Sequence, residues 1–258
     1  MKKKLRADLY LVENNYFETR SKAEIAIREG RVKINGEFIH KPGTPINLEK
    51  NNEVVVTKED KYVSRGGYKL EKALREFNLN VENKICLDIG SSTGGFTDCL
   101  LKNNAKKVYA VDVGYGQLDS KLRNNPKVIV YERTNIRNIN DSFFDEKIDV
   151  VVVDVSFISI TKFLHNIIKF LNDDFIIIVL VKPQFESDRG DTVKGIVKDK
   201  KIFLKVLLRI KEYLEKNNLY LNNITVSPIK GAKGNIEFLI KVTKNSNSVS
   251  DREIEQLI

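Results

Sequence analysis

The sequence contains few of the residues that form disulfides or metal centres. Its 258 residues include two cysteines, two histidines and no tryptophan. Cys86 and Cys99 lie in apolar segments without metal-ligand spacing, and they do not resemble the disulfide framework of a secreted domain. His40 and His165 are far apart along the chain, so the sequence predicts no metal site. We therefore expect a protein of the reducing cytoplasm.

Long apolar runs are also absent. The longest, residues 175–181, has charged residues on both sides and is far shorter than the roughly 20 residues that span a bilayer. The lysines at positions 2–4 are not followed by an apolar segment, so they do not indicate a secretory signal. We therefore expect no interaction with membranes.

Positive charge is in excess. The chain has 44 Lys and Arg against 35 Asp and Glu, a formal net charge of +9. Such a surplus favours polyanionic partners, of which nucleic acid is the commonest. A lysine-rich composition without any such partner would give the same balance, so charge alone leaves both interpretations open. The length allows one medium domain and a small one.

The first sixty residues predict a small α+β domain. Apolar spacing over residues 5–12 predicts one helix, and Ser21 followed by Glu24 is a capping box for a second helix that Gly30 would end. Residues 31–39 alternate around an Asn-Gly pair, which is typical of a type I′ hairpin. The basic side chains here fit a solvated surface or an RNA-binding face equally well: Arg6, Arg20, Lys22, Arg28, Arg31, Lys33 and Lys41.

The remainder alternates strands and helices. The predicted strands cover residues 85–87, 108–113, 148–153, 175–181, 224–226 and 236–242, and the predicted helices cover 70–77, 96–102, 160–171 and 199–216. This order predicts an α/β fold in which helices cover both faces of a mostly parallel sheet. Ligands bind such sheets at the carboxyl ends of the strands. Asp154 and Lys182 each follow a predicted strand, although the first exposed residue after a buried strand is often charged.

The most informative segment is L-D-I-G-S-S-T-G-G-F-T, residues 87–97. Its glycines do not follow G-x-G-x-x-G, and the wider loop suits an adenosylmethionine better than a pyrophosphate. Asp112, near the end of the next strand, can accept hydrogen bonds from both ribose hydroxyls of an adenosine. A tight βα turn without a ligand remains the alternative. The predicted cofactor-binding residues are Gly90, Ser91, Ser92, Gly94, Gly95, Phe96, Asp112 and Val113.

Several motifs resemble known families. G-R-V-K-I-N-G, with R-A-D-L before it and K-P-G after it, resembles the S4 RNA-binding domain over about residues 5–55. V-S-R-G-G-Y-K-L, the glycine-rich segment, A-V-D-V-G, V-V-D-V-S-F-I-S and V-K-P-Q-F-E together are similar to the TlyA family, historically called haemolysins. The catalytic domain of that family is similar to the FtsJ-type ribose 2′-O-methyltransferases. The resemblance covers about residues 4–243.

The resemblance implies an S4 domain over residues 1–57, a linker over 58–64, a Rossmann-like methyltransferase domain with a mostly parallel seven-stranded sheet over 65–245, and a peripheral tail over 246–258. It also implies S-adenosylmethionine-dependent 2′-O-methylation of cytidine in ribosomal RNA. Ribosomal RNA or ribosomal subunits would be the partners, and a monomer is favoured.

The family's Lys-Asp-Lys-Glu tetrad falls on Lys69, Asp154, Lys182 and Glu237. Lys182 is expected to be the general base, losing its proton more easily because of partial burial and the like charge of Lys69. Asp154 would orient Lys182. Lys69 would hold the developing oxyanion or a phosphate, and Glu237 would position a lysine or the ribose.

The resemblance also suggests further contacts. Asn135 is expected near the adenine. Phe157 would stack on the target nucleotide or belong to the core, and Arg65, Arg133 and Arg189 would contact the RNA backbone.

One motif departs from the family. Some members carry an Arg-x-Trp-Val linker where this chain reads Asp60-Lys61-Tyr62-Val63, which puts the linker's contribution in doubt. A membrane-damaging haemolysin and a non-catalytic RNA-binding protein are the alternative functions.

Overall fold

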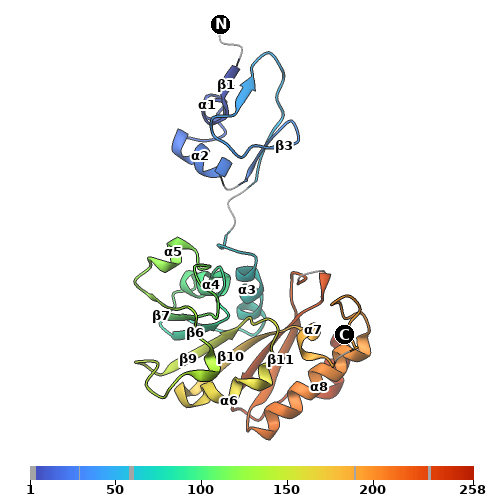
Figure 1. Ribbon diagram of the computed structural model, residues 1–258. Helices are drawn as coiled ribbons and strands as arrows, with labels where there is room; N and C mark the ends of the chain where they lie inside the picture. The colour runs from blue at the N-terminus through green and yellow to red at the C-terminus, as the bar shows by residue number, and fades with distance from the viewer. Residues whose placement is uncertain (1–3, 29, 58–60, 189, 232–233) are drawn as a thin grey trace. The chain divides into compact units, whose positions relative to one another are not determined.

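The computed structural model describes residues 4–28, 30–57, 61–188, 190–231 and 234–258 (Figure 1). The chain divides into two compact units, Met1–Lys61 and Tyr62–Ile258. Tyr62 is almost completely buried among core residues of the second unit.

The N-terminal unit is a small α+β fold. Its helices are α1 (Ala7–Glu13) and α2 (Arg20–Arg28), and its strands are β1 (Lys4–Arg6), β2 (Val32–Ile34), β3 (Glu37–Phe38), β4 (Pro45–Asn47) and β5 (Val54–Val56). β1 pairs with β4, and β2 lies between β3 and β5 in a three-stranded antiparallel sheet. The core consists of small and aliphatic side chains: Ala7, Leu11, Ala23, Ala26, Ile27, Val32, Ile34, Ile39 and Ile46.

Two local predictions for this unit had different outcomes. The hairpin turn is confirmed, since Asn35 and Gly36 have φ of 54° and 83°, as a type I′ turn requires. The capping box at Ser21 is wrong because α2 already begins at Arg20, and the side chain of Thr19 accepts a hydrogen bond from the Lys22 amide at 3.3 Å.

The second unit is built on a seven-stranded sheet. Its strands are β6 (Ile85–Ile89), β7 (Lys107–Val111), β8 (Val128–Tyr131), β9 (Ile148–Val153), β10 (Leu171–Val181), β11 (Tyr220–Val226) and β12 (Phe238–Thr243). The strand order is β11-β12-β10-β9-β6-β7-β8. The pairs from β10 through β9, β6 and β7 to β8 are parallel, whereas β12 is antiparallel to both β10 and β11. The predicted α/β fold with a mostly parallel sheet is confirmed.

Helices cover both faces of this sheet (Figure 1). α3 (Gly66–Glu76) and α4 (Gly95–Lys102) pack through Leu70, Phe96 and Leu100 on one face. α6 (Leu164–Ile167), α8 (Lys200–Lys216) and α9 (Asp251–Leu257) pack on the other. Ile254 of α9 is fully buried, so the C-terminal segment expected to be peripheral contributes to the main core. Two further short helices are α5 (Ser120–Arg123) and α7 (Pro183–Glu186).

The single helix predicted over residues 160–171 is wrong. This segment forms two 3₁₀ turns, η2 (Ile160–Lys162) and η3 (Ile168–Phe170), on either side of α6. Phe163 has φ of −141°, which lies outside the helical region and interrupts the hydrogen-bond ladder. A third 3₁₀ turn, η1 (Ile136–Asn138), follows β8.

Strand register aligns the carboxyl ends of four strands. Ile89 at the end of β6 pairs with Val111 of β7 and with Val153 of β9, and Val153 pairs with Val179 of β10. The residues that follow these strands therefore meet at one edge of the sheet, and they include Gly90, Asp112, Asp154 and Lys182.

Candidate active site

Two neighbouring cavities lie at this edge. The first, of about 540 Å³, is lined by Lys69, Lys182 and Glu237, together with residues of the glycine-rich turn. The second, of about 480 Å³, is lined by Asp112 and Asn135. Both cavities include the same five residues, so they form one continuous site: Gly90, Ser92, Asp154, Ser156 and Phe157.

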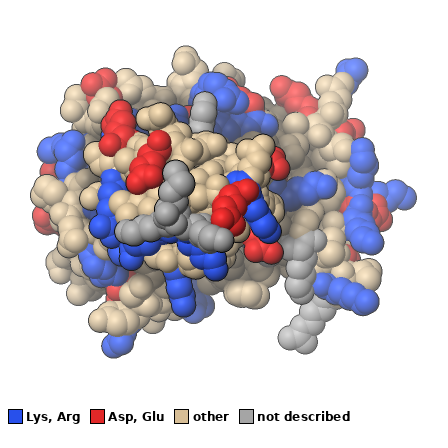
Figure 2. Space-filling model, turned by 90° about the horizontal axis from the view of Figure 1, so that it is seen from above, with Lys and Arg blue, Asp and Glu red and all other residues tan. Residues whose placement is uncertain are grey.

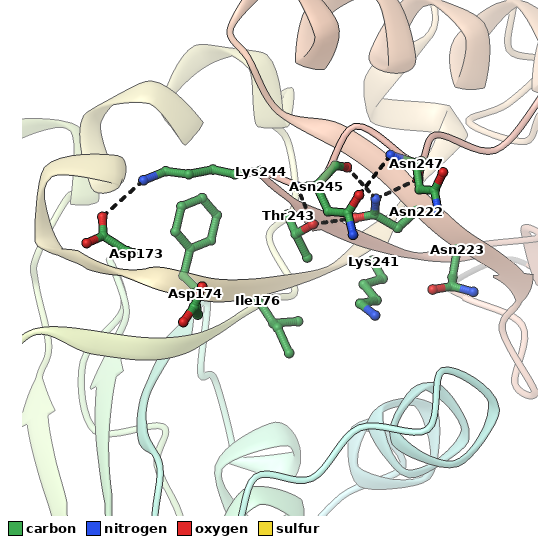
Figure 3. A pocket seen from close by; sticks show the side chains of 11 residues that line it. Asp173, Asp174, Ile176, Asn222, Asn223, Lys241, Thr243, Lys244, Asn245 and Asn247 are labelled. Carbon is green, nitrogen blue, oxygen red and sulfur yellow. Dashed lines mark hydrogen bonds and ion pairs between the residues drawn. The ribbon is translucent and has the colours of Figure 1, made fainter.

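A third cavity lies at the opposite end of the sheet. It has a volume of about 430 Å³ and is lined by residues at the start of β10 and the end of β12, including Asp173, Thr243 and Lys244 (Figure 3). Its polar groups largely satisfy one another: Lys244 pairs with Asp173 at 3.4 Å, and the Asn222 amide donates to the carbonyls of Asn245 and Asn247. The carboxyl edge therefore remains the candidate active site.

The four residues of the predicted tetrad line the first cavity as two ion pairs. Nζ of Lys69 lies 2.6 Å from Oε2 of Glu237, and Nζ of Lys182 lies 2.5 Å from Oδ1 of Asp154. Lys69 and Glu237 are 12% and 2% exposed, whereas Lys182 and Asp154 are 12% and 23% exposed. Each lysine therefore has one acid as its ion-pair partner.

The two pairs differ in geometry. Lys69 donates an aligned hydrogen bond to Glu237. The Lys182–Asp154 contact lacks hydrogen-bond alignment, and Lys182 instead donates to Oγ of Ser156 at 3.0 Å. Lys182 is thus held by an acid and a hydroxyl at once.

Four separate elements position these side chains. Lys69 lies in the first half of α3, Asp154 follows β9, Lys182 precedes α7, and Glu237 immediately precedes β12. A Cβ on Gly231 would lie only 2.0 Å from Oε1 of Glu237, so a side chain at this position would displace the carboxylate from its present place.

The glycine-rich turn packs closely on its neighbours. Gly90 has φ of 83°, and a Cβ on it would lie 2.5 Å from the carbonyl oxygen of Asp154. A Cβ on Gly94 would lie 2.2 Å from Leu122, and one on Gly95 would lie 2.3 Å from Oγ of Ser64. Packing inside the protein therefore accounts for all three glycines. Phe96 is buried beneath the turn.

Asp112 accepts hydrogen bonds from two backbone amides. Ser92 donates to Oδ2 at 2.8 Å, and Gly114 donates to Oδ1 at 2.6 Å. Each carboxylate oxygen keeps a second lone pair, so the side chain can still accept from a pair of hydroxyls. Val113 is exposed beside it, and Ser91 is buried in the turn.

Asn135 also lines the second cavity. Its Oδ1 accepts a hydrogen bond from the Arg137 amide at 3.1 Å, which caps η1. The apolar wall beside it includes Ile89, Val111 and Ile136.

Asp88 belongs to none of the predicted sets of site residues. This residue of β6 is completely buried, Thr97 donates to its Oδ2 at 2.6 Å, and its Oδ1 has no hydrogen-bond partner among the described residues. Burial, with smaller contributions from Asp154 and Asp112, raises the pKa of Asp88 to about 7. A carboxylate inside an otherwise apolar strand was the signal that could have identified it.

We expect Asp88 to make stability depend on pH. The pKa of Asp88 is higher in the folded state than in the unfolded state. The stabilisation that this side chain gives to the folded state is therefore complete below the unfolded-state pKa of about 3.9, and it is lost as the pH rises through about 7. Relative to Asp88→Asn, the wild-type free energy of unfolding should fall by on the order of a few kcal/mol over that range. Urea unfolding of both proteins at several pH values measures the difference, and a difference independent of pH would contradict the prediction.

The predicted RNA-binding cations of the first unit are mostly paired with acids. Asp8 is completely buried, and it binds Arg6 and Arg20, each at 2.8 Å. The hydrogen bond from Arg6, followed by that from Arg20, holds the pKa of Asp8 well below its usual range. Lys22 pairs with Glu18, and Arg28 lies 3.6 Å from Glu24. On the face seen in Figure 2, acidic side chains likewise lie among basic ones.

The other three predicted RNA-binding cations of this unit, Lys33, Lys41 and Arg31, have different surroundings. Nζ of Lys33 lies 4.4 Å from the ring centroid of Phe38. Lys41 is exposed, and Arg31 is half-buried, with its carbonyl accepting from the Thr57 amide.

The residues of the second unit that were predicted to contact RNA lie at separate positions. Arg65 lines the first cavity just before α3. Phe157 is 88% exposed between the two cavities, which excludes a position in the core, and its ring lies 4.7 Å from that of Phe185. Arg133 lies over the Tyr115 ring at 4.1 Å. Arg189 is outside the described residues.

Sequence reasoning missed several residues that line the first cavity. They include Ser156, Gln184, Phe185 and Lys230. Ser156 and the Gln184–Phe185 pair lie in motifs that were recognised, but only the folded chain shows which of their side chains reach the cavity.

The strand order and the site at its carboxyl edge define an α/β methyltransferase of the Rossmann-like class. Residues 62–244 match the FtsJ-like methyltransferase family, and residues 5–51 match the S4 domain. With its close relatives, the chain belongs to the TlyA family of FtsJ-like methyltransferases.

The relatives match along almost their whole length. Hemolysin A of Brachyspira hyodysenteriae is 50% identical over 237 residues, covering 91% of this chain and 98% of the relative. The 16S/23S rRNA (cytidine-2′-O)-methyltransferase TlyA of Mycobacterium tuberculosis is 36% identical over 260 residues, covering 100% and 97%. A solved hemolysin structure from Streptococcus thermophilus has 40% identity and a TM-score of 0.75, covering 100% of this chain and 95% of its own.

Across the residues that the structure describes, no helix combines the length and apolar character needed to cross a membrane.

Proposed function

We propose that this protein transfers a methyl group from S-adenosylmethionine to the 2′-hydroxyl of a cytidine in ribosomal RNA. The observation that carries the proposal is the convergence of two lysine–acid pairs beside a cavity that continues to Asp112. The relative from Mycobacterium tuberculosis, named for this reaction, supports the choice of nucleoside.

The second cavity fits the adenosyl part of the cofactor. Its volume lies in the range of small-molecule sites, and its apolar wall beside Asn135 suits a flat base. Asp112 would accept the ribose hydroxyls on its remaining lone pairs. The shared region around Gly90 and Ser92 would then hold the methionine part next to Asp154.

The tetrad would prepare the hydroxyl for transfer. The bound cofactor supplies an electrophilic methyl group on a sulfonium. Lys182 loses one proton to solvent, and its Nζ then accepts the proton of the 2′-hydroxyl, while Asp154 and Ser156 fix its direction. Lys69 stabilises the negative charge that develops on the oxygen, and Glu237 holds Lys69 in place.

The S4 unit would hold structured ribosomal RNA or a ribosomal subunit in the cytoplasm. Contacts of basic side chains with phosphates position the RNA without reading its sequence. Phe157, exposed between the cavities, would stack on the target base once that base leaves its helix.

The test is methyl transfer to ribosomal RNA in vitro. The purified protein with S-adenosylmethionine should place 2′-O-methyl marks on cytidines of 16S or 23S rRNA, mapped by mass spectrometry of nuclease fragments. Marks only on other nucleotides would overturn the assignment to cytidine. Absence of transfer, together with leakage of dye-loaded liposomes, would favour the membrane-active alternative.

A further inference from the structure

Three side chains form a row across the sheet of the N-terminal unit. Lys33 of β2 pairs with Phe38 of β3 on one side and with Val55 of β5 on the other. Its neighbours Val32 and Ile34 are buried in the core. Because side chains alternate along a strand, the row Phe38–Lys33–Val55 lies on the opposite, outer face of the sheet.

This row is unusually apolar for an outer face. Phe38 is 50% exposed and Val55 is 45% exposed, and Lys33 extends between them with its ammonium over the Phe38 ring. The ring of His40 lies 6.1 Å from that of Phe38. An exposed aromatic ring next to a cation is the combination that binds single-stranded nucleic acid.

The charge of Lys33 is also uncompensated. Within the described ranges Lys33 forms no ion pair, whereas Arg6, Arg20, Lys22 and Arg28 all do. A phosphate can therefore approach Lys33 without displacing a carboxylate from it.

We propose that the row Phe38–Lys33–Val55 is a base-stacking platform for an unpaired nucleotide of the bound RNA. The base of this nucleotide stacks on the Phe38 ring, and its phosphate forms an ion pair with the ammonium of Lys33. This inference rests on the proposed function, because it assumes that the S4 unit holds RNA, and it names a contact outside the helices of that unit.

A second copy of this chain is a poorer occupant of the same face. A protein surface over the row would bury the Lys33 ammonium, and that burial is costly without a carboxylate partner. An RNA strand provides a phosphate beside every base, so it satisfies the ring and the cation together.

The experiment compares four variants of the full chain. Phe38→Ala removes the ring, Phe38→Tyr keeps it, and Lys33→Ala removes the cation. Leu48→Ala is the matched control, because Leu48 is 44% exposed in the same unit but lies outside the row. The probes are a short oligocytidylate RNA and the same oligonucleotide with abasic riboses, titrated at several salt concentrations. Because Phe38 is half exposed, Phe38→Ala should fold, and circular dichroism checks this.

Phe38→Ala should weaken binding of oligocytidylate by roughly 5- to 150-fold with an unchanged salt dependence, because stacking releases no counterions. Phe38→Tyr should bind as the wild type does, and Leu48→Ala should stay within about twofold. Lys33→Ala should lower the slope of log affinity against log salt by about 0.7. With the abasic probe, Phe38→Ala should bind as the wild type does.

Three results would overturn the platform. They are unchanged binding by Phe38→Ala, an equal loss with the abasic probe, and a wild-type dimer in analytical ultracentrifugation that Phe38→Ala dissociates. Methyl transfer to ribosomal RNA by the wild type, measured in parallel, separates this failure from failure of the proposed function.

Discussion

Replacing Lys182 with methionine should lower kcat for methyl transfer by at least about 1,000-fold, within the range lost when a general base is removed. Methionine keeps most of the side-chain length but has no nitrogen to accept a proton. The cofactor dissociation constant should change by less than about threefold, because Lys182 lines the first cavity and Asp112 lines the second. Single-turnover transfer of a radiolabelled methyl group and calorimetric titration of the cofactor measure the two quantities.

Two variants test the role of Lys182 more closely. Lys182→Arg keeps the positive charge but cannot accept a proton at neutral pH, so it should be nearly as inactive as Lys182→Met. Lys216→Met, at an exposed surface position, is the control and should retain full activity. If Lys182→Arg retained turnover near the wild-type rate, Lys182 would act through its positive charge, and its assignment as the general base would be wrong.

The second large effect concerns the pair Lys69–Glu237. Replacing only Glu237 with leucine leaves the Lys69 ammonium largely buried without its acid, which should destabilise the protein by about 3–5 kcal/mol. The double variant Lys69→Met with Glu237→Leu should recover most of that stability, because neither charge remains. It should not recover methyl transfer. Urea unfolding followed by circular dichroism measures stability, and the transfer assay measures activity.

The pair Lys216–Glu212 provides the matched control. Both side chains are exposed, so Glu212→Ala should cost less than about 1 kcal/mol. A double variant that stayed as unstable as Glu237→Leu alone would show that Glu237 supports the fold through contacts other than its ion pair. A double variant with normal transfer would remove both residues from the catalytic proposal.

The sequence predicted those parts of the site that depend on local order. Asp112, Asp154 and Lys182 each follow an apolar strand, and parallel strands bring such positions to one edge of the sheet. Glu237 carries no comparable signal. It reaches the site because β12 inserts antiparallel between β10 and β11. That pairing is non-local, so the spacing of residues along the sequence does not predict it.

The wrong predictions have other causes. The segment over residues 160–171 has helical spacing, but the backbone of Phe163 breaks it into short turns. The basic residues near the N-terminus gave no indication that buried Asp8 binds both Arg6 and Arg20, since ion-pair partners are chosen by the folded geometry. Resemblance to a family supplied the tetrad, and the structure shows that it divides into two pairs.

The contact between Gly90 and Asp154 has a mechanical consequence. The Asp154 amide donates to the carbonyl of Ile89 at 3.0 Å, and the Asp154 carbonyl occupies the space where a side chain at position 90 would begin. The turn proposed to hold the methyl donor and the acid that orients Lys182 therefore have no hinge between them. A compound that pushes the turn outward would move Asp154 with it and misalign the proton acceptor, so it would inhibit methyl transfer without occupying the pocket proposed for the adenosyl group.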